Sequence, residues 1–116
     1  PSWLRNLAAE VLFKSGDRAM SRRMWQHIES QSEGAMRANA QAQLWVLDAL
    51  DEADRLAELA GKYTRRMGHS PGSLRDLMSV GLLDAPPVDI TGVPFEYDAG
   101  TGQVTIGRSS RLNRPR

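Results

Sequence analysis

The longest periodic stretch of this 116-residue chain runs from residue 35 to residue 67, and it limits most strongly what the chain can fold into. Small and apolar residues recur there in steps of three and four, the spacing that places side chains on one face of an α-helix. Many are alanines, which let a second helix approach closely. The stretch therefore predicts the central element of a mainly α-helical fold. Its positions are Ala35, Ala38, Ala42, Trp45, Ala49, Ala53, Leu56, Ala60, Tyr63 and Met67.

One step in this stretch breaks the alternation of three and four, between Ala49 and Ala53. Two interpretations follow. Either residues 34–68 form one long helix, or two helices meet near residues 48–51. Asp51 could cap a new helix, since Asp is among the preferred N-cap residues. We favour two helices, or one helix with a kink at this point.

Two shorter amphipathic segments precede the long stretch, and both have helical spacing. Residues 2–15 follow Ser2, whose hydroxyl can cap the first turn. In residues 18–31, Trp25 lies beside an apolar series that repeats every four residues. Gly16 and Asp17 are the turn between the two helices, and so short a turn predicts an antiparallel helical hairpin. The apolar series are Trp3, Leu7 and Val11 in the first helix, and Met20, Met24 and Ile28 in the second.

The C-terminal part of the chain changes from helical spacing to alternation. We expect Ser73 to cap a short helix that ends near Val80, with Gly81 as the residue after its C-cap. Residues 94–98 and 103–106 then alternate apolar and polar side chains around a turn rich in glycine. This pattern predicts a two-stranded β-hairpin that docks its apolar face on the helices.

Together these elements predict a single helical domain over residues 1–107 with a C-terminal β-hairpin. It comprises a helical hairpin (2–31), a long helical stretch (34–68), and a short helix with the β-hairpin (73–107). Residues 108–116 are predicted to be a flexible, arginine-rich tail. The tail carries Arg108, Arg111, Arg114 and Arg116 and no acidic residue.

Composition sets few limits on function. There are 15 basic and 14 acidic residues, so the net charge of +1 gives no global field toward nucleic acid or membrane. The chain has no cysteine, which removes thiol nucleophiles and thiolate metal sites. No apolar run approaches the ~18 residues that span a bilayer. Because the first residue is Pro1, we expect that a segment preceded it, and the compartment stays open.

The residues that could carry chemistry have simpler structural interpretations. His27 and His69 lack the spacing of a metal-binding pair, and we assign them structural or surface roles. The acidic residues between 48 and 58 lie on a helix rather than in a calcium-binding loop, so we interpret them as a solvated face. No nucleophile has a base at a suggestive spacing. The sequence thus predicts no catalytic, cofactor-binding or metal-binding residue.

The tryptophans and the tail arginines are the candidate partner-binding residues. Trp3, Trp25 and Trp45 fit packing between helices, but tryptophan is also enriched at the centres of protein interfaces. The four arginines of the tail could contact an acidic partner, nucleic acid or an anionic surface. Aromatic residues do not alternate with them, as they do in many binders of single-stranded nucleic acid.

Residues 2–50 resemble a tetratricopeptide-type helical hairpin. The resemblance is carried by Ala9 and Leu12 before the Gly-Asp turn, and by Ser21, Trp25 and Ile28 after it. It differs from that pattern in having Ser21 at the small position after the turn and no proline after the second helix. The resemblance implies a repeat protein whose helices bind segments of other proteins.

Residues 63–107 are similar to a stretch of bacterial type II secretion pseudopilins and to the C-terminal tails of some bacterial repeat proteins. The resemblance implies a structural or assembly subunit, and no metal ligands carry over with it. Ile90 stands where the pattern usually has proline, and no hydrophobic N-terminal anchor helix is present. The matching positions are Tyr63, Gly68, Pro71, Leu74, Leu77, Gly81, Leu82, Pro87, Asp89, Gly92, Pro94, Phe95, Tyr97, Asp98, Gly102 and Val104.

These observations favour a non-enzymatic scaffold or assembly subunit of a larger bacterial complex, or a fragment of a longer repeat protein. The expected partner is another protein, with no cofactor. A membrane would be involved only indirectly or through a missing upstream segment. The alternative is a binder of nucleic acid or an anionic surface through the arginine-rich tail, and we expect nucleic acid less than protein.

Overall fold

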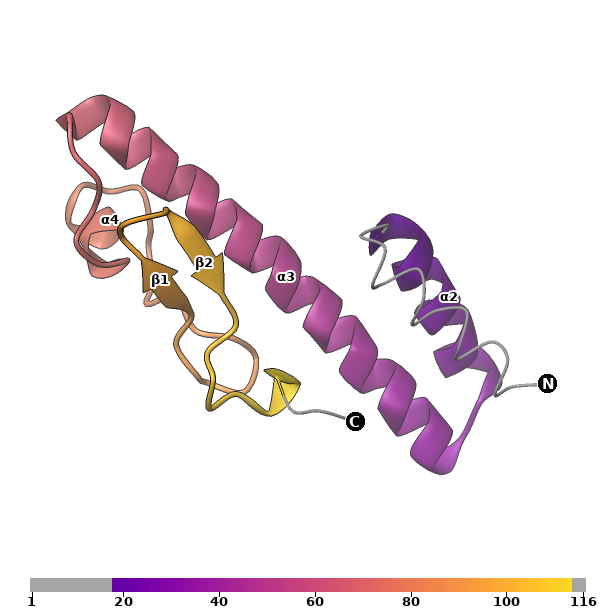
Figure 1. Cartoon of the computed structure of the whole chain (residues 1–116). Helices are drawn as coiled ribbons and strands as arrows, with labels where there is room; N and C mark the ends of the chain where they lie inside the picture. Colours follow the sequence, from indigo (N-terminus) through magenta and orange to yellow (C-terminus); the bar gives the residue numbers. More distant parts are fainter. Residues whose placement is uncertain (1–17, 114–116) are drawn as a thin grey trace. The chain divides into compact units, whose positions relative to one another are not determined.

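The structure is a computed structural model that describes residues 18–113 (Figure 1). Its helices are α2 (Arg18–Gln31), α3 (Gly34–Met67) and α4 (Arg75–Ser79). Strands β1 (Glu96–Asp98) and β2 (Gln103–Thr105) pair antiparallel, and a short 3-10 helix, η1 (Arg111–Asn113), follows. The predicted mainly α-helical fold with a C-terminal β-hairpin is therefore confirmed. The helix predicted over residues 2–15 and Trp3 lie outside the described residues.

Residues 34–67 form one continuous helix, so the favoured interpretation is wrong where it placed two separate helices here. Asp51 lies inside α3 and caps no new helix. The segment around it, Asp-Ala-Leu-Asp-Glu, contains neither glycine nor proline. Alanine, leucine and glutamate are strong helix formers, so nothing in the local backbone interrupts the hydrogen-bond ladder. A change in side-chain periodicity alone did not end the helix.

The chain divides into two compact units, residues 1–48 and 49–116, with the boundary inside α3. The single domain predicted over residues 1–107 stays a prediction. Each unit has buried side chains of its own, and each is described separately below.

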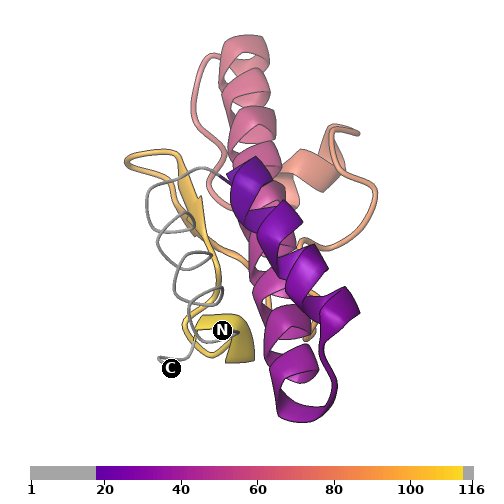
Figure 2. The same cartoon turned by 90° about the vertical axis from the view of Figure 1, so that its right-hand side faces the viewer.

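In the first unit, α2 and the first part of α3 pack around Trp25. The indole is fully buried among Ile28, Ala40, Leu44 and Leu47. Figures 1 and 2 show the two helices side by side and joined by a short loop. Gly34 has a φ of 61° at that loop, a left-handed conformation that favours glycine.

The buried positions of this part of α3 do not follow the predicted stripe. Ala35, Ala38 and Trp45 are exposed, whereas Ala40, Leu44 and Leu47 are buried. The predicted stripe is buried from Ala49 to Tyr63, and Met67 at its end is exposed. A single apolar stripe along α3 would face a single core. The two units instead bury different faces of the same helix.

In the second unit, the buried side chains come from the rest of α3 and from the segments that follow it. Each later segment contributes only one or two apolar side chains, so this core is assembled from residues far apart in sequence. The buried set is Ala49, Ala53, Leu56, Ala60 and Tyr63 of α3, followed by Leu74, Leu77, Leu83, Phe95, Ile106 and Leu112.

Helix α4 ends as predicted but does not begin as predicted. Gly81 has a φ of 80°, its N–H donates to the Met78 carbonyl, and the Leu82 N–H donates to the Leu77 carbonyl. This pair of bonds is the Schellman motif expected at a C-terminal glycine. Ser73 is not the N-cap, since Leu74 occupies that position without a side-chain bond. The Asp76 carboxylate instead accepts the Gly72 N–H at 2.8 Å.

The β-hairpin and the start of the tail are both fixed to the second unit. Tyr97 pairs with Val104 between the two antiparallel strands. Beyond the hairpin, Ser110 and Leu112 are buried. The prediction of a flexible tail from residue 108 is therefore wrong for residues 108–113. Leu112 buries apolar area and Ser110 makes buried hydrogen bonds, which offset the entropy of ordering this segment.

Candidate functional site

A groove of about 310 Å³ lies in the second unit, and it is the candidate functional site. The segment before α4, the loop after it and the start of the hairpin form its walls. Three prolines make the walls stiff, because proline fixes the backbone angle φ. The described lining residues are Gly72, Ser73, Leu74, Arg75, Pro86, Pro87, Val88, Pro94, Phe95 and Tyr97.

Backbone hydrogen bonds hold the two proline-bearing segments of the groove together. The Phe95 N–H donates to the Pro87 carbonyl at 3.0 Å, and Val88 forms an isolated antiparallel bridge with Pro94. The Tyr97 hydroxyl donates to the carbonyl of the fully buried Pro71 at 3.0 Å, which ties the hairpin to the segment that follows α3. The groove is thus preformed by contacts within the chain.

Asp89, which is only 8% exposed, organises the loop behind the groove. Its Oδ1 accepts the Thr91 N–H at 2.8 Å, the Thr91 hydroxyl and the Val93 N–H. Its Oδ2 accepts the Ser110 hydroxyl at 2.5 Å. Burial raises the pKa of Asp89, but the hydrogen bonds from Ser110, Thr91 and Val93 together lower that pKa below its ordinary value. The ionised Asp89 carboxylate therefore links the groove loop to the C-terminal segment through hydrogen bonds.

The rim of the groove carries uncovered apolar surface and one negative region. Val88 is 44% exposed and lines the groove, while Ile90, two residues further on, is 66% exposed and does not. Burial, and then the charges of Asp76 and Asp98, raise the pKa of Tyr97. Asp76 and Asp98 thus place negative charge near the tyrosine hydroxyl.

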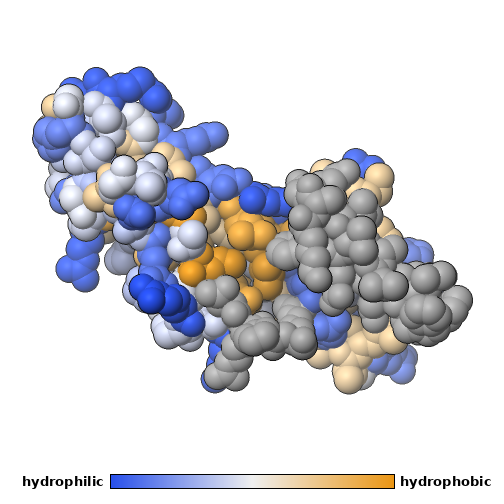
Figure 3. Space-filling model, viewed as in Figure 1, coloured by the Kyte–Doolittle hydropathy of each residue, from blue (hydrophilic) through white to orange (hydrophobic). Residues whose placement is uncertain are grey.

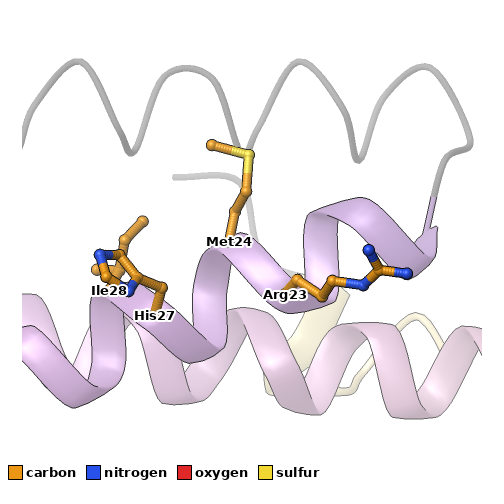
Figure 4. Close-up of a pocket in the computed structure, with 4 residues that line it drawn as sticks. All are labelled: Arg23, Met24, His27 and Ile28. Carbon is orange, nitrogen blue, oxygen red and sulfur yellow. The ribbon is translucent and has the colours of Figure 1, made fainter.

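A second, smaller cavity of about 290 Å³ lies on α2 in the first unit. Its described lining residues are Arg23, Met24, His27 and Ile28, which Figure 4 shows on successive turns of the helix. Met24 extends away from the helix axis there, and the Arg23 side chain runs along the helix. All four side chains come from one helix, so among the described residues this cavity has only one wall.

The predicted tryptophan anchors occupy two different environments. Trp25 is completely buried in the first unit, so a partner cannot reach it while α2 and α3 stay packed. Trp45 is 37% exposed. The side-chain amide oxygen of Gln41 accepts the Trp45 indole N–H at 3.0 Å, and the amide nitrogen of Gln41 donates to the Glu29 carboxylate. Trp45 thus belongs to a link between α2 and α3.

Two of the four tail arginines, Arg108 and Arg111, lie within the described residues. Arg108 is exposed and pairs with Glu96 at 3.1 Å, and the Arg108 N–H also donates to that carboxylate. These two contacts lower the pKa of Glu96. Arg111 is exposed in η1. Arg114 and Arg116 lie outside the described residues.

The histidines and the acidic residues form no metal site in the described part of the chain. No group of three or more His, Asp or Glu residues within 18–113 could hold a metal ion. His69 packs its ring edge to face with Tyr63 at 5.6 Å. Asp48 pairs with Arg22 and Glu52 with Arg55. Some of the predicted solvated acidic face is therefore engaged in ion pairs.

Two further observations concern the basic end of α3 and the apolar character of the helices. The C-terminal end of α3, at the upper left of Figure 3, is hydrophilic, and Lys62, Arg65 and Arg66 are exposed there. Basic residues at this end complement the helix dipole, which suffices to explain them. None of the helices within residues 18–113 combines the length and apolar character needed to cross a membrane.

Comparison with known proteins gives no relative: no family model, curated protein or solved structure matches this chain. The two resemblances noted in the sequence therefore remain expectations.

Sequence reasoning singled out no residue of the groove as a binding residue, although Pro87, Pro94, Phe95 and Tyr97 were noted for their turn and strand pattern. One sequence signal could have indicated the groove. A proline pair at positions 86–87 is followed at 94–97 by a segment with a third proline and two aromatic residues. Stiff, apolar segments that pair with each other leave a fixed channel, but the pairing itself is a long-range contact.

Proposed function

We propose that this chain is a non-enzymatic interaction module that binds a segment of another protein in the groove of the second unit. The observation that carries the proposal is the groove itself, with three prolines and two aromatic residues held by internal hydrogen bonds. Preformed apolar sites of this kind avoid the entropic cost of ordering the receptor. Their volume suits one or two side chains of a partner.

The exposed Val88 supports the same proposal. An apolar side chain that stays 44% exposed at the edge of a concave apolar surface gains free energy when a partner covers it. Val88 follows the stiff Pro86-Pro87 pair, so little of its backbone freedom is lost on binding. The groove can therefore retain a peptide without folding around it.

The test is peptide selection on the full chain followed by mapping of the bound peptide. Random peptides displayed on phage are selected against the protein, and the best binders are titrated by nuclear magnetic resonance. We expect perturbed amide resonances at residues 72–75 and 86–97. Substitution Val88→Glu places a charge inside the groove and should weaken binding about tenfold or more.

The matched control is Ile90→Glu, which introduces the same charge in the same loop outside the groove. Its affinity should stay within about twofold of the unsubstituted chain, as for most surface substitutions. Peptides that bind Val88→Glu and Ile90→Glu equally well, or a selection that yields no binder, would contradict the proposal.

A further inference from the structure

Arg75 is the one charged side chain among the described residues that line the groove. Its side chain is exposed and has no hydrogen bond or ion pair with another residue in the described part of the chain. Two other arginines of the same unit are paired, Arg55 with Glu52 and Arg108 with Glu96. An arginine guanidinium is a strong, planar donor to carboxylates. The groove thus carries an available cation beside its apolar walls.

The other donors of the groove are largely engaged within the chain. Proline has no N–H, so Pro86, Pro87 and Pro94 offer none. The Phe95 and Val88 N–H groups donate to the carbonyls of Pro87 and Pro86. The Tyr97 hydroxyl donates to Pro71, and the Gly72 N–H donates to Asp76. Among the side chains of the groove, Arg75 and the hydroxyl of nearby Ser73 are left to donate to a ligand.

The acids near the groove set where a negative ligand can be accepted. Burial raises the pKa of Tyr97, and the nearby negative charges of Asp76 and Asp98 raise it further. A carboxylate is repelled there and attracted to Arg75. The prolines, Phe95 and the Tyr97 ring face are left for an uncharged, apolar group.

From this arrangement we propose that the occupant of the groove is an extended protein segment with one large apolar side chain next to an aspartate or glutamate. The apolar side chain packs on the proline and aromatic walls, and the carboxylate pairs with Arg75. This inference rests on the proposed function, since it names the partner chemistry of the same groove. It assigns to Arg75 the role of selecting acidic segments over basic ones.

The test uses three synthetic peptides with both ends blocked. The probe is Ser-Asp-Phe-Asp-Ser, which carries an acid on each side of the apolar residue, and its partners replace both aspartates by asparagine or by lysine. Each is titrated into the full chain, and dissociation constants are taken from the groove resonances. We expect the aspartate peptide to bind about fivefold or more tightly than the asparagine peptide, as for a charge-assisted hydrogen bond. The lysine peptide should bind most weakly.

A charge reversal at the receptor separates attraction by Arg75 from general electrostatics. In Arg75→Glu the order should reverse, so that the lysine peptide binds most tightly. The control Arg66→Glu makes the same change of net charge on an exposed arginine outside the groove, and the original order should persist.

Each remaining outcome decides against the inference. Equal binding of all three peptides in the groove would overturn the role of Arg75 while leaving the groove as a binding site. The same order in the unsubstituted chain and in Arg75→Glu would assign the preference to charges elsewhere. If none of the three peptides perturbs the groove resonances, the inference is also overturned. The proposed function is then tested separately by the peptides selected on phage.

Discussion

Asp89 is a buried carboxylate whose contribution to stability depends on its charge. Hydrogen bonds from Ser110, Thr91 and Val93 depress its pKa in the folded chain. A depressed folded-state pKa adds stability that is complete above the unfolded value of about 3.9 and is lost as pH falls through the folded pKa. We therefore expect Asp89→Asn to destabilise the second unit by about 1–3 kcal/mol at neutral pH and by less near pH 3.

Urea unfolding at the two pH values measures this effect. Asp84→Asn is the control, since Asp84 is exposed and accepts no bond described in the structure. It should change stability by less than about 0.5 kcal/mol. A loss in Asp89→Asn that is the same at both pH values would show that its ionisation is not what stabilises the loop.

Gly107 is required for a close backbone approach in the second unit. A Cβ at this position would lie 2.5 Å from the Pro94 carbonyl oxygen and 2.9 Å from Val93 Cγ1. Since the first of these atoms belongs to the backbone, it cannot rotate away. We expect Gly107→Ala to lower the free energy of unfolding by about 1–3 kcal/mol. Thermal unfolding followed by circular dichroism measures it.

Gly61 gives the opposite expectation with the same substitution. It lies inside α3, and its Cβ would meet only the flexible end of Arg65 at 3.5 Å. Alanine in a helix interior is favoured over glycine by roughly 0.5–1 kcal/mol, so Gly61→Ala should stabilise the chain. If both substitutions destabilise to the same extent, the close approach of Gly107 to Pro94 is not the cause.

The α2–α3 hairpin depends on one large side chain with an unusual defect. Trp25 is fully buried, and its indole N–H has no hydrogen-bond partner among the described residues. Trp25→Ala should cost about 3–5 kcal/mol, as truncation of a buried aromatic side chain leaves a cavity. Trp25→Phe should cost clearly less, because it keeps most of the ring and removes a buried unsatisfied donor.

Urea unfolding followed by helical circular dichroism compares these variants. Trp45→Ala is the matched control in the same hairpin, since Trp45 is 37% exposed and should lose only about 1 kcal/mol. Equal losses in Trp25→Phe and Trp25→Ala would mean that the indole N–H is satisfied or that the whole indole is needed for packing.

At the scale of helices and strands, the sequence predicted the features that depend on neighbouring residues better than those that depend on long-range contacts. The β-hairpin and the role of Gly81 follow from turn chemistry within a few residues. The side-chain cap by Ser73 failed because the N–H groups of the first helical turn donate to backbone carbonyls, Asp76 to Ser73 and Leu77 to Leu74. The buried register of α3 before Ala49 failed because it depends on what α2 packs against, and no single-helix pattern contains that information.

At the scale of the molecule, the groove could not be predicted from the sequence, because it too depends on long-range contacts. Its walls come from residues 72–75, 86–88 and 94–97, and only their pairing makes them concave. The glycine and proline positions predicted turns but not which turns would meet. The order of residues 108–113 was missed because Ser110 is polar in sequence and becomes a buried partner of Asp89 only in the fold.

The two compact units predict that stability is not uniform along the chain, although α3 runs through both. Trp25→Ala removes core contacts of the first unit alone, and Gly107→Ala disturbs the second unit alone. Hydrogen exchange should therefore accelerate in α2 for Trp25→Ala and in β1 and β2 for Gly107→Ala, each leaving the other region unchanged. Amides of α3 near residue 48 should respond to both substitutions, because one helical ladder carries the loss across the boundary. If each variant instead accelerates exchange by one common factor from residue 18 to residue 113, the described chain unfolds as a single cooperative unit despite its two cores.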